Sequence, residues 1–207
     1  MDKRFWTFIS YILHPLFMPT IGTFIVLWND PALFISLNYI TPWLIIMGSV
    51  FSCTVLLPLI FSWALLKMER ISSLEQPTEN DRRTLMVFAE MGFLLTYLAF
   101  HNIPNLGRSL SLFMLGINIA MIATLAASFI KRISFHATGI GGVLGTVIGL
   151  AYYTRLDLKY WICGAIVLAW SAGYARYRLR AHDTFEIYLG YIVGILSLSL
   201  VFIIGAK

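Results

Sequence analysis

The sequence predicts an all-α fold, a polytopic transmembrane helical bundle of six or seven spans. Of its 207 residues, 59% are hydrophobic and only 12% are charged, whereas soluble domains carry roughly 25% charged residues. The mean hydropathy is +0.80, and apolar stretches of helix-spanning length recur from one end of the chain to the other. Because these stretches leave no room for a soluble domain, we expect a single integral-membrane domain over 1–207.

Seven apolar segments are each long enough, or nearly long enough, to cross a bilayer as a helix, which takes about 20 residues. They occupy 5–28, 43–66, 85–102, 110–130, 137–154, 159–175 and 184–204. The third and fifth segments are short, so one pair could be re-entrant or tilted, which leaves six or seven spans. The connections are short except for the polar segment 67–84.

Two local patterns inside these segments concern helix shape. Pro15 and Pro19 follow His14 in the first segment, and proline breaks the backbone hydrogen-bond ladder of a helix. We expect a kink there, with His14 either hydrogen-bonded at the kink or entering a pocket. Glycines at four-residue spacing in the fifth and last segments predict close helix packing. These glycines are Gly141, Gly145, Gly149, Gly190 and Gly194.

Cysteine usage and net charge exclude several classes of protein. Cys53 and Cys163 both lie inside apolar segments, so they indicate neither a disulfide framework nor a metal site. The net charge of +5 is modest, and Lys and Arg in a membrane protein mainly report its orientation. We therefore expect no nucleic-acid partner.

Three polar clusters follow the second, fourth and sixth apolar segments. In a seven-span bundle, the connections after these segments lie on the same side of the membrane as the N-terminus. We therefore expect the three clusters to form one site, since ionisable groups at a membrane edge are costly and are candidates for function. Their members are Arg82 and Arg83, then Ser134 and His136, and finally Arg176, His182 and Glu186.

The residue types in these clusters suit phosphoryl transfer. His182 and Glu186 are one helical turn apart, so the carboxylate can hold one ring nitrogen and leave the other free to react. Adjacent residues point apart on a helix, which favours Glu186 over Asp183 as the partner of His182. Arginine neutralises phosphate oxygens with a forked set of donors, and His136 can protonate a leaving oxygen. No acidic cluster indicates a bound metal, so we expect no cofactor.

The three clusters resemble the motifs of the type 2 phosphatidic acid phosphatases, the integral-membrane branch of the vanadium haloperoxidase superfamily. The family's third motif is Ser-Arg, five residues, His, three residues and Asp, and this chain has Arg176, His182 and Glu186 at that spacing. The second motif, Pro-Ser-Gly-His, is matched by Ser134 and His136. Only the run 81–84, Asp-Arg-Arg-Thr, stands in place of the first motif. The resemblance covers about 67–200 and follows the family's motif order, as in a divergent bacterial member.

The resemblance implies a helical bundle with the motifs at one end, and a metal-independent hydrolase that forms a phosphohistidine. It implies that His182 is the nucleophile, that Glu186 orients it and that His136 is the general acid. It also implies a set of phosphate-binding residues, namely Arg176, Ser134, Arg82 and Arg83, with either Arg82 or Arg83 serving the first motif. The expected partners are membrane lipids and a lipid phosphate or diphosphate substrate, such as phosphatidic acid or undecaprenyl diphosphate, in the bacterial inner membrane.

Two other functions compete with the phosphatase. Thr84 stands where the family's first motif has proline, and Phe135 replaces the glycine of the second motif. These departures favour a catalytically inactive relative that binds anionic lipid or scaffolds a partner. A small transporter is the third candidate, but transporters place polar groups near the bilayer centre, whereas here the charges gather at one predicted end.

The distribution of Lys and Arg predicts which side of the membrane the site faces. When Arg82, Arg83 and Arg176 are set aside as phosphate ligands, eight Lys and Arg residues lie on the predicted site side and four lie on the other. The positive-inside rule then predicts a site that faces the cytoplasm. The family resemblance implies the opposite, because many bacterial relatives act on the outer face of the inner membrane.

Overall fold

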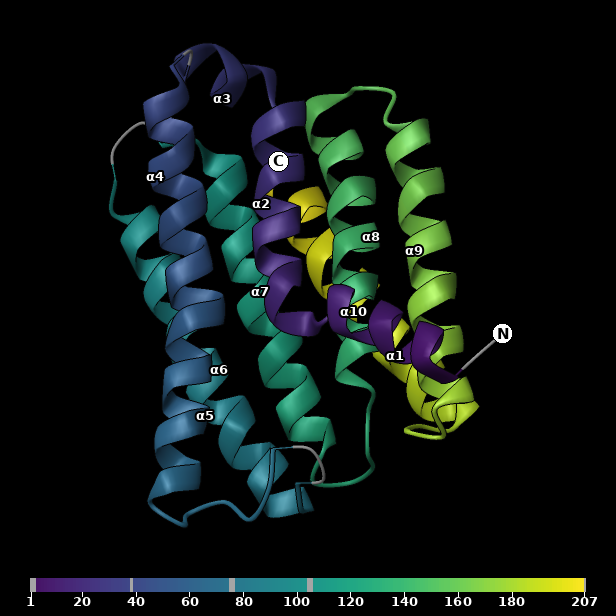
Figure 1. The fold of residues 1–207 in the computed structure, drawn as a ribbon. Coiled ribbons are helices and arrows are strands. Elements are labelled where there is room, and N and C mark those ends of the chain that lie inside the picture. Colours follow the sequence, from purple (N-terminus) through teal and green to yellow (C-terminus); the bar gives the residue numbers. More distant parts are fainter. Residues whose placement is uncertain (1–2, 38, 75–76, 104–105, 207) are drawn as a thin grey trace.

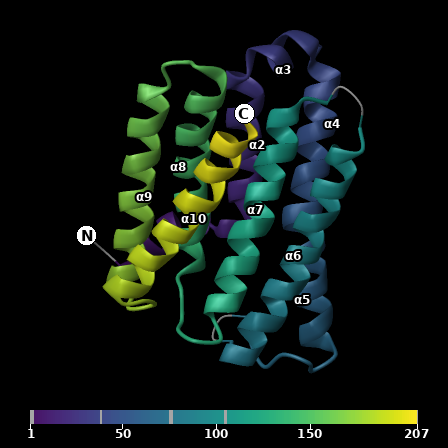
Figure 2. The same ribbon diagram turned by 180° about the vertical axis from the view of Figure 1, so that it is seen from behind.

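The predicted all-α bundle is confirmed. The computed structural model describes residues 3–37, 39–74, 77–103 and 106–206, and within these ranges every regular element is helical. The long helices run between two ends of the molecule, as both views show (Figures 1 and 2). The elements are α1 Lys3–Ile12, η1 Pro15–Phe17, α2 Met18–Asn29, α3 Pro31–Ser36, α4 Ile40–Phe51, η2 Ser52–Leu56, α5 Leu57–Lys67, α6 Glu79–His101, α7 Arg108–Ala127, α8 Phe135–Thr154, α9 Lys159–Arg178 and α10 Thr184–Gly205.

Six helical segments of the described chain are long and apolar enough to cross a membrane; the first comprises α1, η1 and α2, and the second comprises α4, η2 and α5. They are Lys3–Asn29, Ile40–Lys67, Glu79–His101, Arg108–Ala127, Phe135–Thr154 and Thr184–Gly205. The remaining apolar segment forms α9, which has 20 residues but is not among the six. It packs along α8 over much of that helix (Figure 1). The chain is thus a multi-pass membrane protein.

The expected kink in the first segment is a complete break. Helix α1 ends at Ile12, and Nδ1 of His14 accepts a hydrogen bond from the Leu16 N–H at 3.4 Å, which caps the short helix η1. Pro15 and Pro19 have no N–H to donate to the preceding turn. As a result, α1 is strongly inclined to α2 and lies against α9 (Figure 1).

Helices α8 and α10 cross at very close range, as the glycine pattern predicts. A Cβ atom on Gly190 would lie 2.7 Å from the Ser134 carbonyl oxygen, and one on Gly141 would lie 2.9 Å from the Tyr191 carbonyl oxygen. Side chains at these positions would hold the helices apart, so glycine is required for the contact. The crossing places the beginning of α8 beside the beginning of α10.

The three polar clusters lie at the same end of the bundle, as predicted from the order of the segments. The described connecting residues 68–74, 77–78, 128–134 and 179–183 all lie at this end, together with the start of α1 (Figures 1 and 2). The connection between α8 and α9 lies at the other end (Figure 1).

Candidate phosphate site

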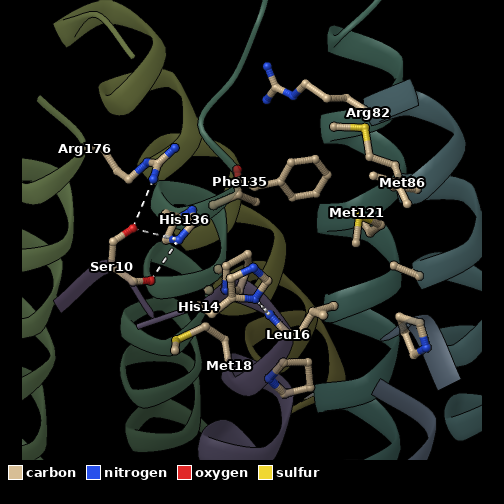
Figure 3. Close-up of a pocket in the computed structure, with 18 of the residues that line it drawn as sticks. Ser10, His14, Leu16, Met18, Arg82, Met86, Met121, Phe135, His136 and Arg176 are labelled. Atoms are coloured by element: carbon tan, nitrogen blue, oxygen red, sulfur yellow. Dashed lines mark hydrogen bonds between the residues drawn. The ribbon is translucent and has the colours of Figure 1, made fainter. Parts of the chain in front are cut away.

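A large cavity opens at the end of the bundle where the polar clusters meet. Its volume is about 1140 Å³, and its lining includes residues from all three clusters. These residues are Arg82, His136, Arg176 and His182, and α1 and the segment after it add Ser10 and His14. Figure 3 shows how Ser10, His136 and Arg176 converge on one side of this cavity, with Arg82 across from them.

His182 is held by the residue that its spacing predicts. Nδ1 of His182 lies 2.7 Å from Oε2 of Glu186, so the ring donates its Nδ1–H to the carboxylate. Asp183 caps α10 by accepting the N–H of Glu186 at 2.7 Å, which occupies the competing carboxylate. Within the described residues, no group is hydrogen-bonded to Nε2 of His182, which therefore keeps its lone pair for reaction.

The surroundings of His182 favour its neutral form. Its side chain is 4% exposed, and burial is the largest cause that lowers the pKa of His182. The hydrogen bond that His182 donates to Glu186 opposes this shift of the pKa, while the positive charges of Arg176 and Arg82 add to it. A neutral imidazole with a free Nε2 is the form that a nucleophile requires.

Arg176 lines the cavity and has more N–H donors than the described protein groups use. Nη1 donates a hydrogen bond to Oγ of Ser10 at 3.0 Å. Nε is buried and has no hydrogen-bond partner among the described residues. A guanidinium has five N–H donors in a planar fork. Arg176 can therefore bind a phosphate while its Nη1 stays hydrogen-bonded to Ser10.

His136 is anchored to the first helix. Its Nε2 lies 3.1 Å from the Ser10 carbonyl oxygen and 3.3 Å from the Ser10 hydroxyl. A carbonyl only accepts hydrogen bonds, so Nε2 carries a proton and donates it to Ser10. Nδ1 is then the nitrogen of His136 that remains for a substrate.

The structure separates the two candidate arginines of the first cluster. Arg82 lines the cavity, where Nη2 lies 3.5 Å from the Ile133 carbonyl oxygen. The guanidinium of Arg83 instead donates to the Ser128 carbonyl oxygen at 2.8 Å and lies over the Phe129 ring. Arg83 is not among the described residues that line the cavity, so the geometry favours Arg82 as a phosphate ligand.

Ser134 has a structural place that differs from its expected phosphate contact. It is fully buried and caps α8, with its Oγ accepting the Ala137 N–H at 3.4 Å. It is also missing from the described lining of the cavity. Phe135 does line the cavity, and in Figure 3 its ring lies between His136 and Arg82.

Ser10 is a site residue that the sequence analysis missed. It is 8% exposed and contacts both Arg176 and His136, which lie 166 and 126 positions later in the chain. Its spacing of four residues from His14 gives no reliable signal, because α1 ends at Ile12, before His14.

Within the described ranges, no group of three or more His, Cys, Asp or Glu side chains lies close enough to hold a metal ion. In comparisons with known proteins, no family model, no curated protein and no solved structure matches this chain.

Proposed function

We propose that this protein is a lipid phosphate or diphosphate phosphatase that acts through a phosphohistidine intermediate. The observation that carries the proposal is the pair formed by His182 and Glu186 in a cavity that also holds Arg176. The Nδ1–H of His182 is on the carboxylate, and the residue lines the same cavity as the arginine. A neutral imidazole oriented by a carboxylate, beside a cation that binds phosphate, is suited to attack phosphorus.

In the proposed reaction, each of the two histidines and the two arginines of the site has its own role. Nε2 of His182 forms a bond to phosphorus, and the bond from phosphorus to the lipid oxygen breaks. His136 enters the reaction as the imidazolium and gives the proton on Nδ1 to that oxygen, while its Nε2–H stays on Ser10. Water then attacks the phosphohistidine, returns a proton to Nδ1 of His136, and releases phosphate and His182. Arg176 and Arg82 stabilise the negative charge that spreads over the phosphoryl oxygens.

The depth of the cavity supports a lipid substrate. Phe113 and Leu198 both line the cavity, and each lies 14 residues along its helix from the polar end, counted from Ala127 in α7 and from Thr184 in α10. At 1.5 Å per residue this is about 21 Å, beyond the middle of a hydrocarbon layer of about 30 Å. A hydrocarbon chain would fill this apolar part while its phosphate lies at His182.

The outer surface offers such a chain a lateral entry. Tyr11 of α1 and Leu59 of α5 both line the cavity, and they are 68% and 52% exposed. A lipid can therefore pass from the bilayer between these helices without leaving the apolar phase, which avoids the cost of exposing its chain to water.

Phosphate release by the purified protein tests this function. The substrates are phosphatidic acid, phosphatidylglycerol phosphate, undecaprenyl diphosphate and lipid A, each presented in detergent micelles without added metal. We expect release from at least one of them, and a phosphoprotein that is labile in acid and stable in alkali when the reaction is quenched. Turnover that survives unchanged in His182→Ala contradicts the proposal.

The second candidate function is the binding of anionic lipid. In this case the protein would be a catalytically inactive relative of the type 2 phosphatidic acid phosphatases. This function is favoured by the Phe135 ring in the cavity and by the packing of Arg83 against Ser128 and Phe129. In that case no lipid phosphate is hydrolysed, and binding to vesicles that contain phosphatidic acid is the same for wild type, His182→Ala and His136→Ala.

A further inference from the structure

We propose that His14, on the segment that breaks the first span, is a further phosphate-binding residue that donates its Nε2–H to a phosphoryl oxygen. The proposal rests on the proposed function for its substrate, but it concerns a residue outside the three polar clusters. His14 lines the cavity together with Arg176 and His182. Figure 3 shows its ring directly below His136.

The capping contact of His14 fixes which ring nitrogen carries the proton. Nδ1 accepts the N–H of Leu16 at 3.4 Å, so in the neutral ring Nδ1 has no proton and Nε2 has one. Among the described residues, no acceptor is hydrogen-bonded to this Nε2–H. His14 thus brings an N–H donor to the cavity lining that the protein itself does not use.

The position of His14 beside His136 suits it to share a ligand with that residue. The two ring centroids are 5.4 Å apart, with an angle of 78° between the ring planes. The Nε2–H of His136 is already donated to Ser10, whereas that of His14 is not. Of these two N–H groups, the one on His14 is therefore available to an anionic oxygen.

The break in the first span is what brings His14 to this place. A continuous helix from α1 into α2 would leave the backbone N–H groups near residue 16 bonded to the preceding turn, and His14 would have no capping role. Close packing holds the broken segment in position, because a Cβ on Gly139 in α8 would lie 3.3 Å from Cβ of Pro15 and 3.0 Å from Cγ of Met18. The prolines and this glycine together set the donor beside α8.

The Nε2–H of His14 supplies a phosphate-binding donor that the first polar cluster, Arg82 and Arg83, lacks. Arg83 is bound to Ser128 and is absent from the described cavity lining, so of this adjacent pair of arginines Arg82 alone lines the cavity. A neutral imidazole N–H adds a directional hydrogen bond to the phosphoryl group without a further positive charge, and such a bond strengthens when the oxygens gain charge in the transition state.

Binding of orthovanadate, an analogue of the phosphoryl group in its transition state, tests the proposal without any need for turnover. Its affinity is measured by titration calorimetry on the purified protein in detergent. His14→Ser keeps a side-chain oxygen that can cap η1, since serine is a favoured N-cap residue, but it removes the Nε2–H, and its short hydroxyl does not have the reach of the ring. His14→Gln keeps an N–H of similar reach. His101→Ser, at the exposed end of α6, is the matched control.

We expect His14→Ser to bind vanadate about 10- to 100-fold more weakly than wild type, the range for loss of one hydrogen bond to a charged group. His14→Gln should recover part of this loss, and His101→Ser should match wild type. If His14→Ser does not fold, His14→Thr offers another cap without a side-chain N–H and takes its place.

The outcomes separate this proposal from the phosphatase function. Wild-type affinity in a folded His14→Ser protein overturns the role of His14, even if lipid phosphate is hydrolysed, and so does a wild-type protein that does not bind vanadate. Vanadate binding that depends on His14 in a protein that hydrolyses no lipid phosphate supports the anion site and contradicts the phosphatase. Both proposals are supported when turnover and vanadate affinity fall together in His14→Ser.

Discussion

The backbone N–H of Ser134 donates a hydrogen bond to the backbone carbonyl of Glu186 at 3.2 Å. This bond joins the start of α8 to the first turn of α10, and thus joins the second polar cluster to the third. His136 lies two residues after Ser134, and His182 lies four residues before Glu186. The relative position of the two histidines therefore depends on the crossing of α8 and α10.

Replacement of a glycine in this crossing should destabilise the protein. A Cβ on Gly194 would collide with the Thr138 carbonyl oxygen and with the backbone of α8, and overpacking of this kind typically costs about 1–3 kcal/mol. We expect Gly194→Ala to lower the thermal unfolding temperature in detergent. Gly164→Ala in α9 is the control, because a Cβ there has no neighbour within 4 Å, and alanine in a helix gains about 0.5–1 kcal/mol over glycine. Equal unfolding temperatures for both variants contradict the packing argument.

Loss of the carboxylate beside His182 should reduce the rate and leave the fold intact. Glu186→Gln keeps the shape of the side chain but no longer stabilises a positive charge on the ring. We expect kcat for lipid phosphate hydrolysis to fall on the order of 10²–10⁴-fold, the range of an acid–base contribution. His182→Ala should abolish turnover. A near-normal kcat in Glu186→Gln, measured beside a wild-type unfolding temperature, removes Glu186 from the mechanism.

The low pKa of His182 sets the direction of the pH dependence. Burial and the charges of Arg176 and Arg82 disfavour the imidazolium in the folded protein, so the nucleophile stays neutral below the ordinary value of about 6.5. The acid limb of the pH profile of kcat/KM should therefore lie below pH 6.5. Because the unfolded chain takes up the proton more readily, the contribution of His182 to folding stability falls as the pH is lowered through 6.5. An acid limb above pH 6.5 argues against this assignment.

The roles of two neighbouring arginines can be separated by conservative replacement. Arg176→Lys keeps the charge but loses the forked donors that contact Ser10 and face the cavity. We expect at least a 10-fold loss of kcat/KM for this variant. Arg178→Lys is the control, since Arg178 is exposed and is not among the described lining residues. Similar losses of kcat/KM in both variants would show that phosphate binding does not depend on the guanidinium geometry of Arg176.

The membrane side of the site can be found by cysteine labelling. In a Cys53→Ala, Cys163→Ala background, Met68→Cys marks the end that carries the site and Tyr39→Cys marks the other end; both positions are exposed. The excess of Lys and Arg predicts that an impermeant maleimide added to intact cells or spheroplasts labels Tyr39→Cys and not Met68→Cys. The reverse pattern assigns the site to the outer face.

The sequence by itself determined those features that depend on neighbours in the chain. Apolar length fixes where the helices run, because each must satisfy its own backbone hydrogen bonds in a bilayer. The contact of His182 with Glu186 follows from a spacing of one helical turn. The prolines after His14 end α1 for the local reason that they have no N–H. The gathering of the polar clusters at one end follows from the order of the spans.

Tertiary structure decided which side chains reach the cavity. Arg82 and Arg83 are adjacent, and only the packing of α6 against the segment 128–134 turns the second towards Ser128. Ser134 is buried at the place where α10 packs on the start of α8, since a Cβ on Gly190 would lie 2.7 Å from the Ser134 carbonyl oxygen. Ser10 and His14 reach the site through the tilt of α1 against α9. These contacts join residues more than 40 positions apart, and their geometry depends on how helices cross, which the spacing of residues along one helix does not specify.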